Sequence, residues 1–263
     1  MDIRDTIKAT NTAIATVDLV KDYGSGNNTV HALRGVNVAF EQGKFTAIMG
    51  PSGSGKSTLM HTLAGLDSAT GGHIIFNGDD LTRMNDNQLT LLRRRDIGFI
   101  FQSFNLLPMF TAEQNILMPL TLAGAKPDRQ WLRLLVETLG LKERLNHRPN
   151  ELSGGQQQRV AIARALITKP KLVFADEPTG NLDSVSSAEV LSFLKRSVNE
   201  LGQTIIMVTH DAVAASYADR ALVFADGQIV TDVNNPTADQ MSELLLKERE
   251  AATMNAASAR HSH

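Results

Sequence analysis

The sequence predicts an α/β fold in which a mostly parallel sheet is accompanied by a small antiparallel β subdomain and a helical subdomain. Short apolar, β-branched runs alternate with helical patterns along most of the chain, which is typical of a parallel sheet covered by helices. The section Ala13–Phe40 is instead rich in strands and turns through Gly24–Asn28, which favours a small antiparallel sheet. The section from about Thr111 to Asn150 is mostly helical and can form a separate lobe.

Strands are expected where apolar, β-branched runs are bounded by Gly, Asn or Asp. The predicted strands are Ala13–Val20, Val36–Phe40, Phe45–Met49, His73–Phe76, Ile97–Phe101, Lys171–Ala175, Thr204–Val208 and Ala221–Phe224. Helices are expected where apolar residues recur with the helical period. The predicted helices are Lys56–Ala64, Asp86–Arg94, Trp131–Leu139, Gln156–Ile167, Ser186–Leu201 and Asp211–Tyr217.

Composition excludes several classes of site. Hydrophobic residues make up 42% and charged residues 21% of the 263 residues, so the chain can bury a core. It contains no cysteine, which excludes a disulfide scaffold, a cysteine-based zinc site and a cysteine nucleophile. The formal net charge of −2 argues against a protein that binds nucleic acid by neutralising its phosphates.

We expect an N-terminal extension over residues 1–12, one folded domain over 13–249 with a helical lobe at about 103–168, and a disordered tail over 250–263. The extension carries charges and lacks the apolar segment of a secretory signal. No stretch approaches the roughly 18 uninterrupted apolar residues of a membrane-spanning helix. These patterns predict a soluble, intracellular chain.

A phosphate-binding loop is predicted between the strand Phe45–Met49 and the helix Lys56–Ala64. Its glycines let backbone N–H groups surround the β- and γ-phosphates of a nucleotide, and the helix N-terminus adds its positive end. Lys56 supplies a charge to the same phosphates, and the Ser57 hydroxyl ligates Mg²⁺. The alternative, an ordinary glycine-rich turn, is disfavoured by the strand–loop–helix order. The predicted phosphate-binding residues are Gly50, Pro51, Ser52, Gly53, Ser54, Gly55, Lys56, Ser57 and Thr58.

Two adjacent acids, Asp176 and Glu177, end the apolar strand near Lys171–Ala175. In a parallel sheet, ligands gather at the carboxyl ends of the strands. Asp176 is therefore expected to hold Mg²⁺ through a water molecule, and Glu177 to polarise the water that attacks the nucleotide. Paired acids are also common surface features, so this interpretation depends on the phosphate loop.

Two other polar residues follow predicted strands. Gln102 follows Ile97–Phe101 and offers its amide oxygen to Mg²⁺ and its amide nitrogen to water. His210 follows Thr204–Val208 and can hydrogen-bond the γ-phosphate and the attacking water. A lone histidine after a strand is more often structural, so its functional interpretation depends on the family considered below.

The five residues Leu152-Ser153-Gly154-Gly155-Gln156 precede a predicted helix. Ser153 is a favourable N-cap, and the two glycines allow an anion to approach the helix N-terminus closely. One nucleotide already fits in the predicted phosphate loop. The simplest use for this second helix end is to reach ATP held by another subunit.

These motifs together resemble the nucleotide-binding subunit of ATP-binding-cassette (ABC) transporters, over about Ala13 to Ala225. In that family Gly50–Ser57 corresponds to the phosphate loop, Leu152–Gln156 to the signature and Leu172–Glu177 to the acidic strand. The other correspondences are Tyr23 with the aromatic that stacks on adenine, Gln102 with the Q-loop glutamine, Asp183 with the D-loop acid and His210 with the switch histidine. The alternative for Tyr23 is an exposed tyrosine at a strand end.

The resemblance implies a P-loop NTPase core that uses ATP and Mg²⁺. It implies a head-to-tail homodimer with two ATP molecules at the interface, where Ser153, Gly154, Gly155 and Gln156 of one subunit approach the γ-phosphate bound by the other. Asp183 would couple the two sites. The implied catalytic residues are Glu177, His210 and Gln102, and the implied metal ligands are Ser57, Gln102 and Asp176.

The segments Phe104–Pro108 and Glu177–Asp183 resemble the group of ABC proteins that serves macrolide export and lipoprotein release. That group works with integral-membrane permeases of four transmembrane helices, in two copies, and its ATPase lies as a peripheral subunit on the cytoplasmic face of the membrane. One departure is Gln114, where the group usually has glutamate before Asn115. This segment normally meets the permease.

The region Phe99–Leu122 is apolar for a surface loop region. We expect part of it to fill the core of the helical lobe and part to form a groove for a short cytoplasmic helix of the membrane partner. The expected exposed set is Leu106, Leu107, Met109 and Phe110.

Rival functions are a soluble ABC ATPase that acts on nucleic acid or ribosomes, and a simple P-loop kinase. The single cassette, the absence of cysteine and the short gap between phosphate loop and signature disfavour the first. A kinase gives no reason for Leu152–Gln156. Export or extraction of a peptide, antibiotic, haem or lipid-linked substrate is the expected task, and the sequence does not encode which.

Overall fold

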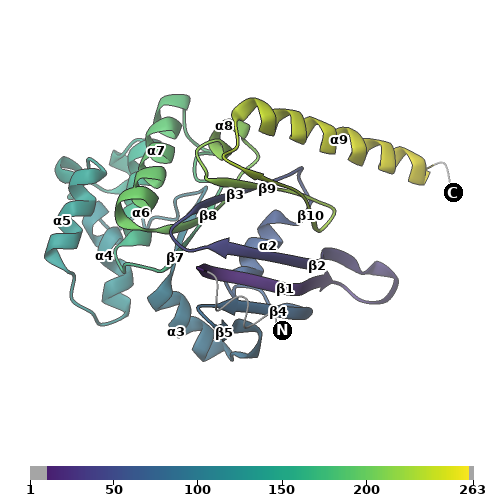
Figure 1. Cartoon of the computed structure of the whole chain (residues 1–263). Coiled ribbons are helices and arrows are strands. Elements are labelled where there is room, and N and C mark those ends of the chain that lie inside the picture. Colours follow the sequence, from purple (N-terminus) through teal and green to yellow (C-terminus); the bar gives the residue numbers. More distant parts are fainter. Residues whose placement is uncertain (1–10, 261–263) are drawn as a thin grey trace. The chain divides into compact units, whose positions relative to one another are not determined.

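The computed structural model describes residues 11–260, which separate into two compact units (Figure 1). The first unit comprises Phe45–Thr82 with the described parts of Met1–Phe40 and Val208–His263. The second comprises Glu41–Lys44 and Arg83–Met207. The predicted helical lobe at about 103–168 lies inside the second unit, and residues 1–10 of the predicted extension lie outside the described residues.

The first unit contains an antiparallel sheet and part of a parallel one. Its strands are β1 (Thr12–Tyr23), β2 (Val30–Glu41), β3 (Phe45–Met49), β4 (Gly71–Phe76), β5 (Asp79–Asp80), β9 (Arg220–Ala225) and β10 (Gln228–Asn234). The first sheet has the order β2-β1-β4-β5, and Ile14 of β1 lies opposite Phe76 of β4 in antiparallel register. The sequence predicted a small antiparallel sheet within Ala13–Phe40, and the structure adds β4 and β5 to it. Strand β3 pairs in parallel with β9, which pairs antiparallel with β10.

Strand β3 is buried along its whole length, which explains its uninterrupted apolar sequence. The helical elements of the first unit are α2 (Lys56–Leu63), α8 (Ala212–Ala215), α9 (Ala238–Arg260), η1 (Gly26–Asn28) and, at its boundary, η2 (Leu81–Arg83).

Helix α9 (Ala238–Arg260) extends into the section 250–263 for which the sequence predicted a disordered tail. It begins beside α8, where Met241 and Leu245 are buried, and continues as one helix to Arg260 (Figure 1). The alanine-rich composition that suggested disorder also has high helix propensity, and the buried first turns give the helix a start. Residues 261–263 lie outside the described part.

The second unit contains three strands and five α-helices among its described residues. The strands are β6 (Ile97–Phe101), β7 (Leu172–Asp176) and β8 (Thr204–Val208), in the order β8-β7-β6. The helices are α3 (Asp86–Asp96), α4 (Ala112–Leu122), α5 (Arg129–Thr138), α6 (Gly154–Leu166) and α7 (Ser184–Leu201), with short turns η3 (Lys142–Arg144) and η4 (Pro149–Glu151).

Strands β6 and β7 run parallel, with Ile97 opposite Leu172 and Phe101 opposite Asp176. Helix α6 is the most buried helix of this unit, and α4, α5, α7 and β6 pack against it. The parallel pairs in both units confirm the predicted α/β class. In the described range 11–260, no helix combines the length and the hydrophobicity that crossing a bilayer requires.

Candidate nucleotide-binding site

The loop between β3 and α2 in the first unit has a backbone that only glycine accommodates. Gly50 has φ +152°, and a Cβ atom there would lie 2.0 Å from the carbonyl oxygen of Phe224. Gly55 has φ +105°, and its Cβ would lie 2.5 Å from the carbonyl oxygen of Ala32. Both contacts are shorter than any real Cβ contact, so side chains at either position would displace the loop.

Helix α2 begins directly after this loop with a glycine N-cap. Gly55 has no side chain, and within the described chain no side chain caps this end of the helix. The first N–H groups of a helix lack intrahelical partners, so the start of α2 can bind an anion. This is the geometry that the sequence predicted for a phosphate-binding loop.

Lys56 folds back across the loop. Its buried ammonium group donates a hydrogen bond to the carbonyl oxygen of Pro51 over 2.7 Å and lies 3.5 Å from the Ser54 hydroxyl. The charge is therefore held inside the loop, where phosphates of a nucleotide would lie. The Ser54 carbonyl accepts a bond of 3.0 Å from the Gly227 N–H, which fixes the other side of the loop.

A cavity of about 580 Å³ opens over this loop in the first unit. The lining includes Tyr23 and the run Gly53–Thr58, so the predicted base-stacking residue and most of the predicted phosphate-binding residues share one cavity. Gly50, Pro51 and Ser52 belong to the loop but do not line the cavity. Such a size suits a nucleotide-sized ligand.

His210 follows β8 and belongs to the first unit. The preceding Thr209 donates its backbone N–H to the carbonyl oxygen of Ile48 over 3.1 Å, and its hydroxyl accepts from the N–H of Asp211. The backbone beside His210 is therefore joined to the end of β3, two residues before Gly50.

The acidic pair and Gln102 meet at one edge of the second unit. Because Phe101 and Asp176 lie opposite each other in parallel strands, Gln102 and Glu177 follow at neighbouring strand ends. The Gln102 side chain packs over Gly180, where a Cβ would lie 2.7 Å from the Gln102 amide nitrogen. The backbone carbonyl oxygen of Gln102 accepts a hydrogen bond of 3.0 Å from the Asn181 side-chain amide. Carboxylate and amide oxygens are the donor set that Mg²⁺ prefers, so Asp176 and Gln102 fit this ion.

Glu177 adopts an unusual backbone conformation. Its φ is +46°, in the left-handed region that costs a non-glycine residue about 1 kcal/mol. The N–H of Gly180 donates to the Glu177 carbonyl over 3.0 Å and closes a turn. The carboxylate is thus placed by a strained turn at the end of β7, a feature often found at functional positions.

Ser153 caps α6, as predicted from the sequence. Its hydroxyl accepts from the Gln156 N–H over 3.3 Å, and the Ser153 N–H donates to the Gln156 side chain over 2.9 Å. This reciprocal capping box uses both side chains within the helix start. Ser153 is exposed and Gly154 partly exposed, so the positive end of α6 is accessible to an anion.

Asp183 caps the next helix, α7, and contacts the signature through Ser186. Its carboxylate accepts from the backbone N–H groups of Val185 and Ser186 and, over 2.7 Å, from the Ser186 hydroxyl. The backbone N–H and hydroxyl of Ser186 hold the pKa of Asp183 below its usual value. A Cβ at Gly155 would lie 2.8 Å from the same hydroxyl, so a side chain there would displace this cap.

The apolar segment after Gln102 is anchored by two buried polar residues that the sequence did not single out. Asn115, fully buried in α4, accepts from Leu107 N–H over 2.8 Å and donates to the carbonyl oxygens of Leu107, Phe110 and Thr111. Arg164 in α6 donates to the carbonyl oxygens of Phe104 and Asn105, over 2.7 and 2.5 Å.

Both carbonyls that Arg164 contacts belong to residues with positive φ, at 53° and 51°. Of the four expected exposed residues, Met109 is 62% exposed, while Leu106, Leu107 and Phe110 are half-buried.

Gln114, the departure from the expected glutamate, accepts a hydrogen bond from the Thr111 N–H in a capping box at the start of α4. An amide oxygen performs this task as a carboxylate would.

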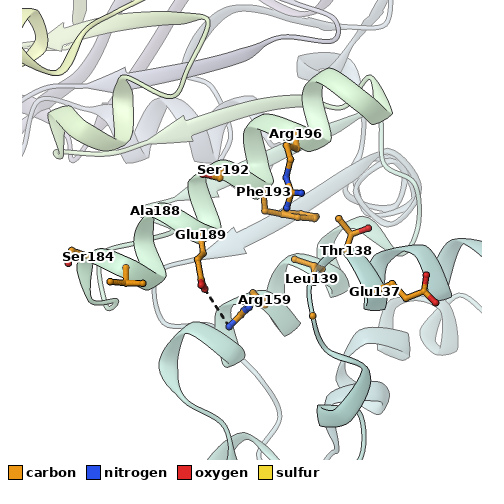
Figure 2. A pocket seen from close by; sticks show the side chains of 12 residues that line it. Glu137, Thr138, Leu139, Arg159, Ser184, Ala188, Glu189, Ser192, Phe193 and Arg196 are labelled. Atoms are coloured by element: carbon orange, nitrogen blue, oxygen red, sulfur yellow. Dashed lines mark ion pairs between the residues drawn. The ribbon is translucent and has the colours of Figure 1, made fainter.

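A second cavity, of about 720 Å³, lies between α5, α6 and α7 in the second unit (Figure 2). None of the sequence-predicted site residues lines it. Arg159 and Glu189 face each other across it at 3.6 Å, and Arg196 and Glu137 add one charge of each sign. Because these charges balance, the cavity lacks the positive field of a nucleotide site.

Comparison with known proteins gives a consistent result. A family model described as ABC transporter matches residues 33–180. The chain is 47% identical over 225 residues to the lipoprotein-releasing system ATP-binding protein LolD of Geobacter metallireducens, covering 83% of this chain and 98% of that protein. It is 49% identical over 217 residues to the macrolide export ATP-binding/permease protein MacB of Marinobacter nauticus, covering 82% of this chain but only 34% of that protein.

Solved structures show the same similarity. A dimeric post-hydrolysis state of the ATP-binding cassette MJ0796 bound to ADP and Pi is 38% identical, with a TM-score of 0.76, covering 84% of this chain and 98% of that one. A second dimeric structure of the same cassette has a TM-score of 0.77 and 39% identity.

Proposed function

The chain belongs to the ABC transporter family, and on that premise we propose that it is the ATP-hydrolysing motor subunit of a transporter, which closes with a second copy around two ATP molecules to drive a separate membrane permease. The similarity to cassettes that were captured as dimers with hydrolysis products supports both the ATPase activity and the dimer.

ATP binding is assigned to the first unit. The loop N–H groups and the start of α2 bind the phosphates, and Lys56 adds a positive charge among them. Tyr23, which lines the same cavity, stacks on the adenine base.

Hydrolysis is assigned to polar residues that follow β6, β7 and β8. Glu177 accepts a proton from the attacking water, while Gln102 and His210 orient that water and the γ-phosphate. Mg²⁺, when bound, neutralises charge on the phosphates. Ser57, Asp176 and Gln102 are the residues that would hold it.

The dimer rests on one observation above all, which is the accessible N-terminus of α6. Besides the helix N-terminus at α2, the chain has an accessible one at Ser153 and Gly154, with an exposed serine hydroxyl. One ATP uses the first end. The second end reaches the γ-phosphate of ATP on the partner copy, with Gly155, Gln156 and Asp183 supporting it.

The permease partner is assigned to the anchored apolar segment, Phe104–Thr111. Its backbone is fixed by Asn115 and Arg164, while Met109 projects into solvent. An apolar surface held in one conformation suits a short amphipathic helix from the cytoplasmic side of a membrane protein. The ATPase then lies on the cytoplasmic face of the membrane, with two permease copies of four transmembrane helices each.

The proposed task is export or extraction of a lipid-linked, peptide, antibiotic or haem substrate. Two relatives support export or extraction, since one is named for lipoprotein release and one for macrolide export. The net charge of −2 favours this function over action on nucleic acid or ribosomes.

The test is the variant Glu177→Gln in the full chain, studied by light scattering and ATP turnover. We expect ATP binding to persist, turnover to fall by ~10²–10⁴, and an ATP-dependent dimer to accumulate. Lys56→Ala is the control, and it should weaken ATP binding and give no dimer. A Glu177→Gln protein that binds ATP but remains monomeric would overturn the dimer mechanism, and undiminished turnover would remove Glu177 as the base.

A further inference from the structure

Three side chains beside the nucleotide cavity form a closed cluster in the first unit. Lys21 and Tyr23 lie near the end of β1, and Asp67 lies in the segment after α2. The Lys21 ammonium donates to Asp67 Oδ1 over 2.6 Å, and the Tyr23 hydroxyl donates to Asp67 Oδ2 over 2.5 Å. Both carboxylate oxygens are thus used, one by each residue.

Lys21 is placed against the aromatic ring. Lys21 is only 7% exposed, and its Nζ atom also donates a hydrogen bond of 2.7 Å to the Ser68 carbonyl. The same atom lies 4.7 Å from the centre of the Tyr23 ring. A cation at this distance from a ring is attracted to its face. The Lys21 ammonium group therefore lies over the face of the Tyr23 ring, while Asp67 binds the hydroxyl at the end of that ring.

The backbone around the cluster is fixed as well. The Asp22 N–H donates to the Thr70 hydroxyl over 3.0 Å, and the Thr70 N–H donates to the Val20 carbonyl over 2.9 Å. The end of β1 is thereby joined to the segment that carries Asp67.

Protonation states agree with this arrangement. Burial and the hydrogen bond to Asp67 raise the pKa of Tyr23 and outweigh the opposing hydrogen bond with Thr58, so the Tyr23 hydroxyl stays a donor at neutral pH. Burial alone would raise the pKa of Asp67, but the hydrogen bonds from Lys21 and Tyr23 outweigh it and lower that pKa, so the carboxylate stays charged.

Tyr23 is nevertheless 41% exposed and lines the cavity. An exposed tyrosine normally samples several rotamers, and ordering it upon binding weakens affinity. We infer that Asp67 and Lys21 are positioning residues that hold the Tyr23 ring in one orientation for the base of the bound nucleotide. This inference rests on the proposed function, in which Tyr23 stacks on adenine.

The experiment measures the affinity of the full chain for ATP and, separately, for inorganic tripolyphosphate, by calorimetry. Tyr23→Phe keeps the ring and removes the hydroxyl that Asp67 holds. It should weaken ATP binding by about two- to tenfold, because the ring must then be ordered on binding, and leave tripolyphosphate binding unchanged. Asp67→Asn should do the same, and in a Tyr23→Ala background it should have no further effect on ATP.

Asp80→Asn is the matched control, because Asp80 also accepts hydrogen bonds from two side chains, but its partners His73 and Thr82 do not line the cavity, whereas Tyr23 does. It should change neither affinity. Lys21→Met removes the cation beside the Tyr23 ring and should also weaken ATP binding while leaving tripolyphosphate binding unchanged. If this variant does not fold, because Asp67 is left without its cation, Tyr23→Phe still carries the test.

Three results would overturn the inference. ATP affinity could be unchanged in Tyr23→Phe and Asp67→Asn while Tyr23→Ala weakens it, which would leave stacking intact but remove the positioning role. Alternatively, ATP and tripolyphosphate could weaken together, which would mean a general effect on the loop. If Tyr23→Ala itself left ATP affinity unchanged, the stacking role in the proposed function would fail, and the positioning role with it.

Discussion

The side-chain amide of Gln158 donates a hydrogen bond of 2.7 Å to the carbonyl oxygen of Pro178. Gln158 is fully buried in α6, and Pro178 directly follows Glu177. The helix that begins at the signature is therefore joined to the strained turn that places the proposed catalytic carboxylate. The other amide atom of Gln158, Oε1, has no partner among the described residues.

Replacing Gln158 by leucine should lower ATP turnover by about tenfold with little loss of ATP affinity, since a hydrogen bond of ~1 kcal/mol that fixes the Glu177 turn is lost. The unpartnered oxygen is removed at the same time, but the buried Pro178 carbonyl loses this donor, so the unfolding free energy should fall by about 1–3 kcal/mol. The measurement is steady-state turnover together with urea unfolding. Gln240→Leu, at an exposed position of α9, is the control and should keep wild-type turnover. Wild-type turnover in Gln158→Leu would contradict the prediction.

The apolar segment should be required for binding the permease. Replacing Leu107 and Met109 together by aspartate should abolish co-purification with the membrane partner, because charges would enter an apolar interface. ATP binding by the isolated chain should persist. The pair Leu91→Asp and Leu134→Asp, two exposed apolar residues elsewhere in the second unit, is the control. Unchanged co-purification of the first pair would reject this surface.

Arg164 should be required for the permease to influence hydrolysis. Burial lowers the pKa of Arg164, and its guanidinium is held by the carbonyls of Phe104 and Asn105. Arg164→Met leaves both carbonyls without this donor and should lower the unfolding free energy by about 2–4 kcal/mol. In protein that still folds, permease-stimulated turnover should fall while ATP affinity is kept.

Arg164→Lys should restore part of that stimulation, since one ammonium can reach one carbonyl. The control is Arg159→Met on the same helix, which loses only a long ion pair to Glu189. Equal stimulation in Arg164→Met and wild type would show that the anchoring is not used for coupling.

Asp183 should stabilise the folded state at neutral pH and lose this effect as the pH falls. Hydrogen bonds from Ser186 lower the pKa of its carboxyl in the folded state. Its stabilisation is therefore present above the unfolded value, about 3.9, and is lost as the pH falls through the folded value. The variant Asp183→Asn should unfold more readily than wild type at pH 7, and the difference should shrink below about pH 4. A difference that is the same at every pH would contradict this.

The sequence predicted the elements that are determined by residues close together in the chain. The bounds of β3, β6 and β8 match the structure because each is a short buried apolar run. The cap at Ser153 and the glycines of the phosphate loop were also predictable, since each acts on its neighbours in the chain. Strand β10 was missed because it is mostly exposed and lacks an apolar run.

The anchoring residues could not be predicted in the same way. Arg164 contacts carbonyls about sixty residues earlier, and Tyr23 contacts an aspartate 44 residues later. Their partners are backbone carbonyls or a common surface acid, which carry no pattern in the sequence. Only the folded chain brings these groups together.

The left-handed backbone at Glu177 has a consequence for heat resistance. Glycine adopts that conformation without the penalty of about 1 kcal/mol that a side chain incurs. A Glu177→Gly protein, which cannot activate water, should therefore unfold at a higher temperature than the active enzyme. Selection for catalytic turnover at this position would then oppose selection for thermal stability. A relative of this chain that has lost its ATPase activity could carry glycine here and be more stable to heat.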